Sequence, residues 1–119
     1  PAADTEGKLA SRIALADRRI SDGRLSGPDG ALDHLLAAKA LRPDDGRVQD
    51  RLRLLADTLE MLGGRALDRG DTAEAEVHLA AALRAAPDRQ SIAAKLDAAK
   101  LPAPRDALTR PGAGEKPPP

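Results

Sequence analysis

The sequence predicts an all-α fold of two helical hairpins followed by a closing helix. Apolar residues recur at steps of three and four along residues 8–100, which is the spacing of one face of a helix. Glycine and proline interrupt this spacing at points that suit short turns. A segment of the first half is also repeated in the second half. Together these observations indicate a pair of helices that occurs twice.

The first hairpin follows a lead-in at residues 1–7, which is expected to be frayed. Its first helix is expected at residues 8–24, with its apolar residues on one face. A turn rich in glycine and proline comes next, and Asp29 is the predicted N-cap of a helix at residues 31–41. Pro43 ends that helix.

The second hairpin begins with a long helix at residues 47–69. One apolar stripe continues along it at alternating steps of four and three, which predicts an uninterrupted helix. A Gly-Asp pair breaks the spacing, which then resumes in a helix that ends before Pro87. Ser91 is the predicted cap of a closing helix that runs to Lys100. Such a helix would cover an apolar face that the last hairpin otherwise exposes to water.

The second helices of the two hairpins carry the repeat. ALDHLLAAKALRPD at residues 31–44 aligns with AEVHLAAALRAAPD at residues 75–88 without a gap, which gives a period of about 44 residues. A histidine, a leucine and the closing Pro-Asp pair match in the two segments. The first half of the chain therefore predicts the architecture of the second.

Residues 59–87 resemble the tetratricopeptide repeat, whose pattern runs large-x2-Leu-Gly-x2-large, then Ala-x3-large, then Pro. The positions that carry this resemblance are Leu59, Leu62, Gly63, Ala66, Ala75, Leu79 and Pro87. Leucine or alanine stands where the family usually has an aromatic residue. The first hairpin matches less well, because Arg12 and Arg19 replace large apolar residues. The family's repeat has about 34 residues, so about ten are extra here. They lie at the start of the helix at residues 47–69.

The composition narrows the class of partner. Nineteen basic and nineteen acidic residues cancel, which argues against nucleic acid. The chain lacks Phe, Tyr and Trp, the residues that stack on single strands. No apolar run approaches the roughly 18 residues that span a bilayer, so no direct membrane insertion is expected. The expected interaction domain is residues 8–100, and the Pro- and Gly-rich residues 101–119 are expected to be a disordered linker or tail.

Neither catalysis nor a metal or cofactor site is expected. His34 and His78 occupy equivalent positions in the repeated helices, and stacked helices are about 10 Å apart. Two donors on one metal ion must be much closer, since each bond is about 2 Å long. Gly63 and Gly64 lie inside a helical stripe with no following Lys-Ser/Thr, so helix packing explains them better than phosphate binding.

The resemblance implies a non-catalytic module that binds a peptide or a partner helix. In the family, the ligand lies on the concave face made by the first helices of successive repeats. The matching positions here are acidic or apolar, which implies a basic or apolar ligand in place of an acidic C-terminal peptide. The partner-binding residues carried over in this way are Ile13, Asp17, Ile20, Glu60, Gly64, Leu67 and Asp68.

The alternative is self-association, as a homodimer or a structural scaffold built on the helix at residues 47–69. The apolar stripe at Val48, Leu52 and Leu55 extends past the length that one hairpin covers. These side chains would pack against the first hairpin, against a second copy of the chain or against a neighbouring domain.

The composition also favours a bacterial origin within a larger protein. A bias toward Ala, Arg, Asp and Gly is typical of GC-rich genomes, and a Cys-free segment with a Pro-rich linker favours the cell envelope over the cytoplasm. A start without Met indicates a processed product or an excised domain.

Overall fold

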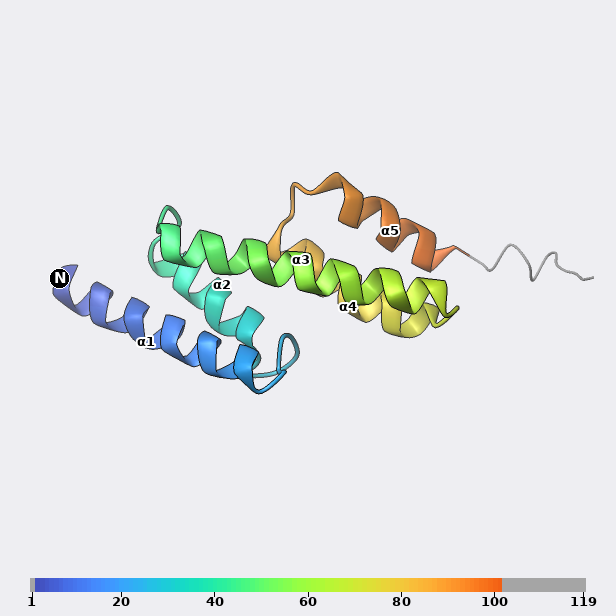
Figure 1. Ribbon diagram of the computed structural model, residues 1–119. Coiled ribbons are helices and arrows are strands. Elements are labelled where there is room, and N and C mark those ends of the chain that lie inside the picture. Colours follow the sequence, from blue (N-terminus) through green and yellow to red (C-terminus); the bar gives the residue numbers. More distant parts are fainter. Residues whose placement is uncertain (1, 102–119) are drawn as a thin grey trace, which may run out of the picture.

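The structure, a computed structural model, describes residues 2–101, with side chains from Asp4 onward. This part of the chain contains five helices and no strand (Figure 1), which confirms the predicted all-α class. The helices are α1 (Ala2–Ser21), α2 (Ala31–Leu41), α3 (Gly46–Asp68), α4 (Thr72–Ala85) and α5 (Gln90–Lys100). Apart from Leu101, the predicted linker or tail lies outside the described residues.

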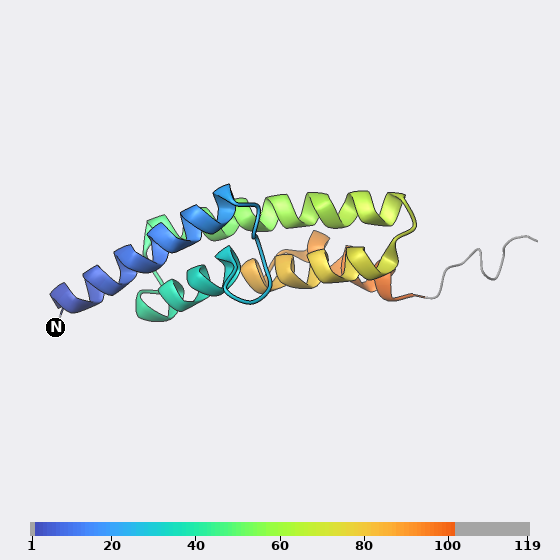
Figure 2. The same cartoon turned by 90° about the horizontal axis from the view of Figure 1, so that it is seen from below.

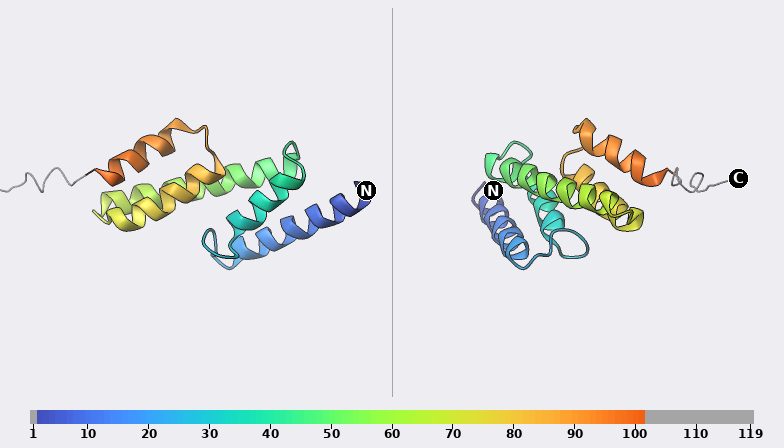
Figure 3. Two further views of the ribbon diagram at one scale, coloured as in Figure 1. Left: turned by 180° about the vertical axis from the view of Figure 1, so that it is seen from behind. Right: turned by 45° about the vertical axis from the view of Figure 1, so that its right-hand side comes forward.

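The first four helices form two packed pairs. Contacts are most extensive between α3 and α4 and between α1 and α2, and the members of each pair run in opposite directions. Figure 2 shows α1 and α3 along one side of the molecule and α2 and α4 along the other. α5 packs mainly on α4, on the side of the second pair that faces away from α1 and α2 (Figure 3). The second pair therefore lies between the first pair and α5.

One apolar core runs through all five helices and consists mainly of leucine and alanine. Its largest fully buried side chains are Leu9, Leu32, Leu35, Val48, Leu55, Leu59, Leu79 and Ile92. Burial of each such side chain stabilises the fold by about 1.5–3 kcal/mol, whereas the smaller alanine contributes less. Stability therefore rests on a small number of aliphatic positions.

α1 begins at Ala2, whereas the sequence predicted a frayed lead-in as far as residue 7. Contacts of Glu6 account for the difference. Its carboxylate accepts hydrogen bonds from Arg42 at 2.8 Å and from Arg47 at 3.1 and 3.2 Å. Because these arginines flank the turn between α2 and α3, the first turns of α1 are held by residues about 40 positions away, which no local pattern reveals.

Two of the predicted helix caps differ in the structure. Asp29 adopts a φ of 59°, and its carboxylate binds His34 and an arginine of α1, so the N-cap of α2 is Gly30 without a side-chain bond. Ser91 lies in the first turn of α5, and Arg89 is the N-cap. At the start of α2, the predicted cap Asp29 pairs with Arg19 of α1 instead. At the start of α5, the observed cap is Arg89, which pairs with Asp57 of α3.

Asp45 caps α3 and makes this turn sensitive to acid. Its carboxylate accepts hydrogen bonds from the Arg47 guanidinium at 2.8 and 3.0 Å and from the Arg47 backbone N–H at 2.9 Å. The guanidinium contact, followed by the backbone contact, lowers the pKa of Asp45 from 3.8 to about 2. Because the folded-state pKa is depressed, the stabilisation is present above about pH 4 and is lost as the pH falls toward about 2.

We expect the free energy of unfolding of the wild type to decrease more steeply between about pH 4 and about pH 2 than that of Asp45→Asn. Asparagine keeps the N-cap hydrogen bond but carries no charge that titrates. Urea denaturation followed by far-UV circular dichroism measures both slopes. Parallel slopes for the two proteins would show that Asp45 does not contribute to the acid response.

Candidate functional site

A groove opens where the ends of α3 and α5 meet. Its hollow has a volume of about 620 Å³ and is lined by Leu67, Asp68, Arg69, Gly70, Thr72, Ala98 and Leu101. Leu67 is half-buried against the core, and Leu101 is 64% exposed. The groove therefore offers apolar surface to solvent at a point where two separate segments of the chain, residues 67–72 and 98–101, meet.

Charge at this groove is acidic once the internal ion pairs are accounted for. The guanidinium of Arg69 is held by Glu74 at 2.8 Å. Asp68 is exposed, and its carboxylate has no cation within 4 Å in the part of the chain that the structure describes. The groove thus combines an apolar surface with one uncompensated carboxylate.

Glu60, which the sequence assigned to the same face, has a structural role instead. Its side chain is 13% exposed and accepts hydrogen bonds from Lys95 at 2.9 Å and Arg89 at 3.2 Å. Burial alone would raise the pKa of Glu60, but the hydrogen bonds from Lys95, Ser91 and Arg89 outweigh burial and lower it. Glu60 therefore fixes the start of α5 on α3.

The α1 residues of the predicted face are also largely engaged within the chain. Ile13 is 6% exposed, and Ile20 is half-buried against the core. The Asp17 carboxylate accepts hydrogen bonds from Arg51 at 2.8 and 3.1 Å. Asp17 therefore connects α1 to α3, although half of its side chain remains in contact with water.

The predicted face is divided by the length of α3. Arg51 marks the point where α1 meets α3, and Asp68 lies 17 residues further along the same helix. At 1.5 Å per residue, this separation is about 25 Å. The ten extra residues of α3 carry its second half beyond α1, so Leu67 and Asp68 meet α5 and not the α1 residues.

The neighbouring glycines of α3 differ in their surroundings. A Cβ on Gly63 would lie 2.5 Å from Cγ of Leu79, whereas a Cβ on Gly64 would meet nothing within 4 Å. Gly63 therefore permits the close approach of α4. Gly64, which the sequence assigned to the partner-binding face, leaves open space there.

The stripe predicted for self-association is covered within one chain. Val48, Leu52 and Leu55 are 0%, 5% and 2% exposed and belong to the common core. A second copy could reach these side chains only by displacing helices that already pack on them. The large exposed apolar side chains of α3 are Leu54 and Met61, which are 59% and 47% exposed.

The histidines lie in separate surroundings, and the described residues hold no cluster of three metal-ligating side chains. His34 is buried, and its Nε2 is 2.7 Å from Asp29 while its Nδ1 is 3.1 Å from Arg12. Because arginine only donates, Nδ1 accepts and Nε2 donates. His78 contacts Glu74 of its own helix at 3.3 Å.

Sequence reasoning missed the contribution of α5 to the groove. Ala98 and Leu101 line the hollow, but Leu101 was assigned to the linker. A signal was present, since Ala94, Ala98 and Leu101 follow steps of four and three and so share one face of a helix. The pattern does not reveal that this face lies beside the end of α3.

Comparison with known proteins assigns no family. No family model matches the chain, and neither characterised proteins nor solved structures gave a match. Among the described helices, none is long and apolar enough to cross a membrane. Arguments about function therefore rest on the geometry of the groove and of the surrounding surface.

Proposed function

We propose that this chain is a non-catalytic protein-interaction module that binds an apolar, basic segment of a partner protein in the groove between α3 and α5. The observation that carries the proposal is the hollow lined by Leu67, Leu101 and the uncompensated carboxylate of Asp68. An amphipathic helix with a leucine and a lysine one turn apart would match this surface, since residues three or four apart lie on the same face.

We also propose that the two helical pairs are divergent repeats of the tetratricopeptide type. Support comes from burial at the aligned positions of α2 and α4. Ala31 and Ala75, Leu35 and Leu79, and Ala38 and Ala82 are all completely buried. Gly63 supports the same view, because a glycine at this position of the pattern lets the second helix of the repeat approach closely.

The proposal is tested by the binding of a fluorescein-labelled amphipathic peptide of leucine and lysine, measured by fluorescence anisotropy. We expect Asp68→Lys to weaken binding about tenfold, which corresponds to the loss of about 1.4 kcal/mol. Asp22→Lys is the matched control, because this carboxylate is exposed and lies outside the groove. Equal affinities for the wild type and Asp68→Lys would refute the proposed site.

Asp17→Lys distinguishes a short ligand from a long one. If the ligand occupies only the groove at α5, this reversal leaves the affinity of the peptide unchanged, since Arg51, the partner of Asp17, lies about 25 Å from Asp68 along α3. If the ligand also follows α1, the affinity falls, and the proposed site extends over both groups of residues. The control is thermal unfolding of the variant, because Asp17 also pairs with Arg51.

A further inference from the structure

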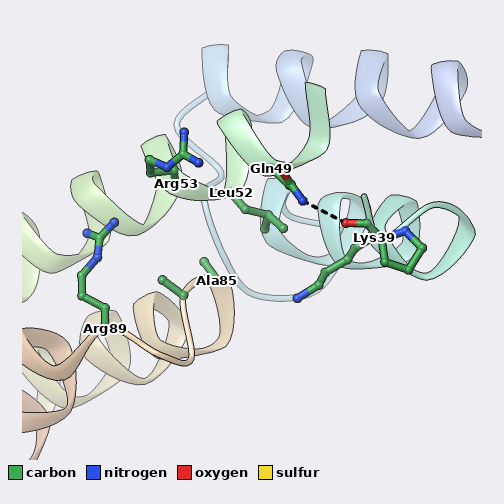
Figure 4. A pocket seen from close by; sticks show the side chains of 8 residues that line it. Lys39, Gln49, Leu52, Arg53, Ala85 and Arg89 are labelled. Carbon is green, nitrogen blue, oxygen red and sulfur yellow. Dashed lines mark hydrogen bonds between the residues drawn. The ribbon is translucent and has the colours of Figure 1, made fainter. Parts of the chain in front are cut away.

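A second hollow lies where the two helical pairs meet, and its rim is basic. It has a volume of about 240 Å³ and is lined by Lys39, Pro43, Gln49, Leu52, Arg53, Ala85, Ala86 and Arg89. Figure 4 shows Arg53 and Arg89 on one side of the hollow and Lys39 on the opposite side, with Leu52 and Ala85 between them. The hollow therefore combines three cationic side chains with an apolar base.

These three cations differ in how far the chain already neutralises them. Arg89 is bound by Asp57 at 2.6 Å and by Glu60 at 3.2 Å. Within residues 4–101, Arg53 pairs only with Asp50, three residues earlier, and both side chains are largely exposed. Such an exposed pair contributes little and exchanges readily for another carboxylate. Lys39 has no carboxylate within 4 Å among the residues that the structure describes.

The positions of Lys39 and Arg53 make the hollow a junction between parts of the fold. Lys39 belongs to the end of α2 in the first pair, and Arg53 belongs to α3 in the second. Contacts between the pairs are sparse compared with those inside each pair. Gln49 donates a hydrogen bond to the Pro43 carbonyl at 3.3 Å across the edge of this junction. A ligand held by both cations would therefore connect the two pairs.

We infer that this hollow binds an acidic, partly apolar segment of a partner protein. A glutamate or aspartate of the segment is held by Lys39 and Arg53, and an adjoining leucine-sized side chain covers Leu52 and Ala85. Arg53 lies 14 residues before Leu67, or about 21 Å along α3, so this surface is separate from the groove at α5. The two surfaces select ligands of opposite charge.

Nucleic acid fits this hollow less well than an acidic peptide does. Binding to a phosphate backbone typically neutralises about 6–10 phosphates, whereas only two cations here are free or weakly paired. The chain also lacks aromatic residues on which bases could stack. The apolar base of the hollow favours a side chain with a hydrocarbon part over a phosphate group.

The test uses the 119-residue chain and the fluorescein-labelled peptide Glu-Leu-Glu-Glu-Leu-Glu, with binding measured by fluorescence anisotropy. We expect the double variant Lys39→Gln and Arg53→Gln to bind this peptide about tenfold more weakly than the wild type. Lys8→Gln with Arg18→Gln is the matched control, because it removes the same charge from exposed positions of α1. Affinity should also fall as salt is raised, since exposed charges are screened.

Two comparison peptides and one oligonucleotide complete the experiment. Replacement of each glutamate by glutamine should weaken binding about as much as the double variant does, and replacement of each leucine by serine should also weaken it. Equal weakening by the control variant, or binding of the glutamine peptide as tightly as the parent, would overturn the inference. Tighter, variant-sensitive binding of a labelled single-stranded oligonucleotide would overturn it in favour of nucleic acid.

The acidic peptide also separates this inference from the proposed function. Asp68→Asn should leave its affinity unchanged, because Asp68 lies outside the basic hollow and asparagine adds no positive charge to the groove at α5. The Lys39 and Arg53 variant should likewise leave the leucine-lysine peptide unaffected. Failure of one pair of measurements therefore leaves the other site standing.

Discussion

Alanine at position 63 is expected to destabilise the chain, whereas alanine at position 64 is expected to stabilise it. Both substitutions improve helix propensity by about 1 kcal/mol relative to glycine. At Gly63 the new Cβ would lie 2.5 Å from Cγ and 2.6 Å from Cδ2 of Leu79, which is completely buried. Overpacking of this kind costs about 1–3 kcal/mol and outweighs the gain in propensity. At Gly64 nothing lies within 4 Å, so the gain remains.

The difference between the two variants, about 1–3 kcal/mol in the free energy of unfolding, is the quantity to measure. Urea denaturation followed by circular dichroism provides it, and the two proteins have identical composition and charge. Gly63→Val should be less stable than Gly63→Ala, because valine places two further methyl groups against Leu79. Stabilisation by alanine at both positions would mean that α4 shifts to accept the methyl group and that Gly63 is not required for helix packing.

Local signals predicted the helices well because helix ends depend on nearby residues. α2 spans the predicted residues 31–41, and α3 begins and ends one residue before the predicted 47–69. Apolar spacing, glycine and proline determine these bounds within a few positions. α1 was predicted six residues too short at its start, since the contact that orders this end comes from Arg42 and Arg47.

The candidate site was predicted only in part, because sequence spacing does not show which charged residues meet. Leu67 and Asp68 line the groove, but beside α5 and not beside the α1 residues that the resemblance placed on the same face. Glu60 does not, because Lys95 and Arg89 of the α5 region neutralise it. The extra turns of α3 were evident in the sequence. Their consequence, the separation of Leu67 and Asp68 from the α1 residues, depends on how far α1 extends beside α3, which the sequence does not show.

Aspartate at position 55 is expected to unfold the chain, whereas aspartate at position 54 is expected to leave it folded. Leu55 is 2% exposed in the common core. Its loss alone costs about 2–5 kcal/mol, and an unpaired buried carboxylate adds a further penalty. The sum approaches or exceeds the roughly 5–15 kcal/mol that stabilises a small domain. Leu54 is 59% exposed, so its replacement changes stability by about 0.5 kcal/mol or less.

The same pair of variants decides whether α3 takes part in self-association. Light scattering after gel filtration, detected by refractive index because the chain lacks aromatic residues, gives the molecular mass. A wild-type monomer with a folded Leu54→Asp variant and an unfolded Leu55→Asp variant would agree with cover of the stripe inside one chain. A wild-type dimer that Leu54→Asp converts to a folded monomer would locate the interface on the exposed face of α3. A folded Leu55→Asp monomer obtained from a dimer would instead return the interface to Val48, Leu52 and Leu55, and would contradict their burial within a single chain.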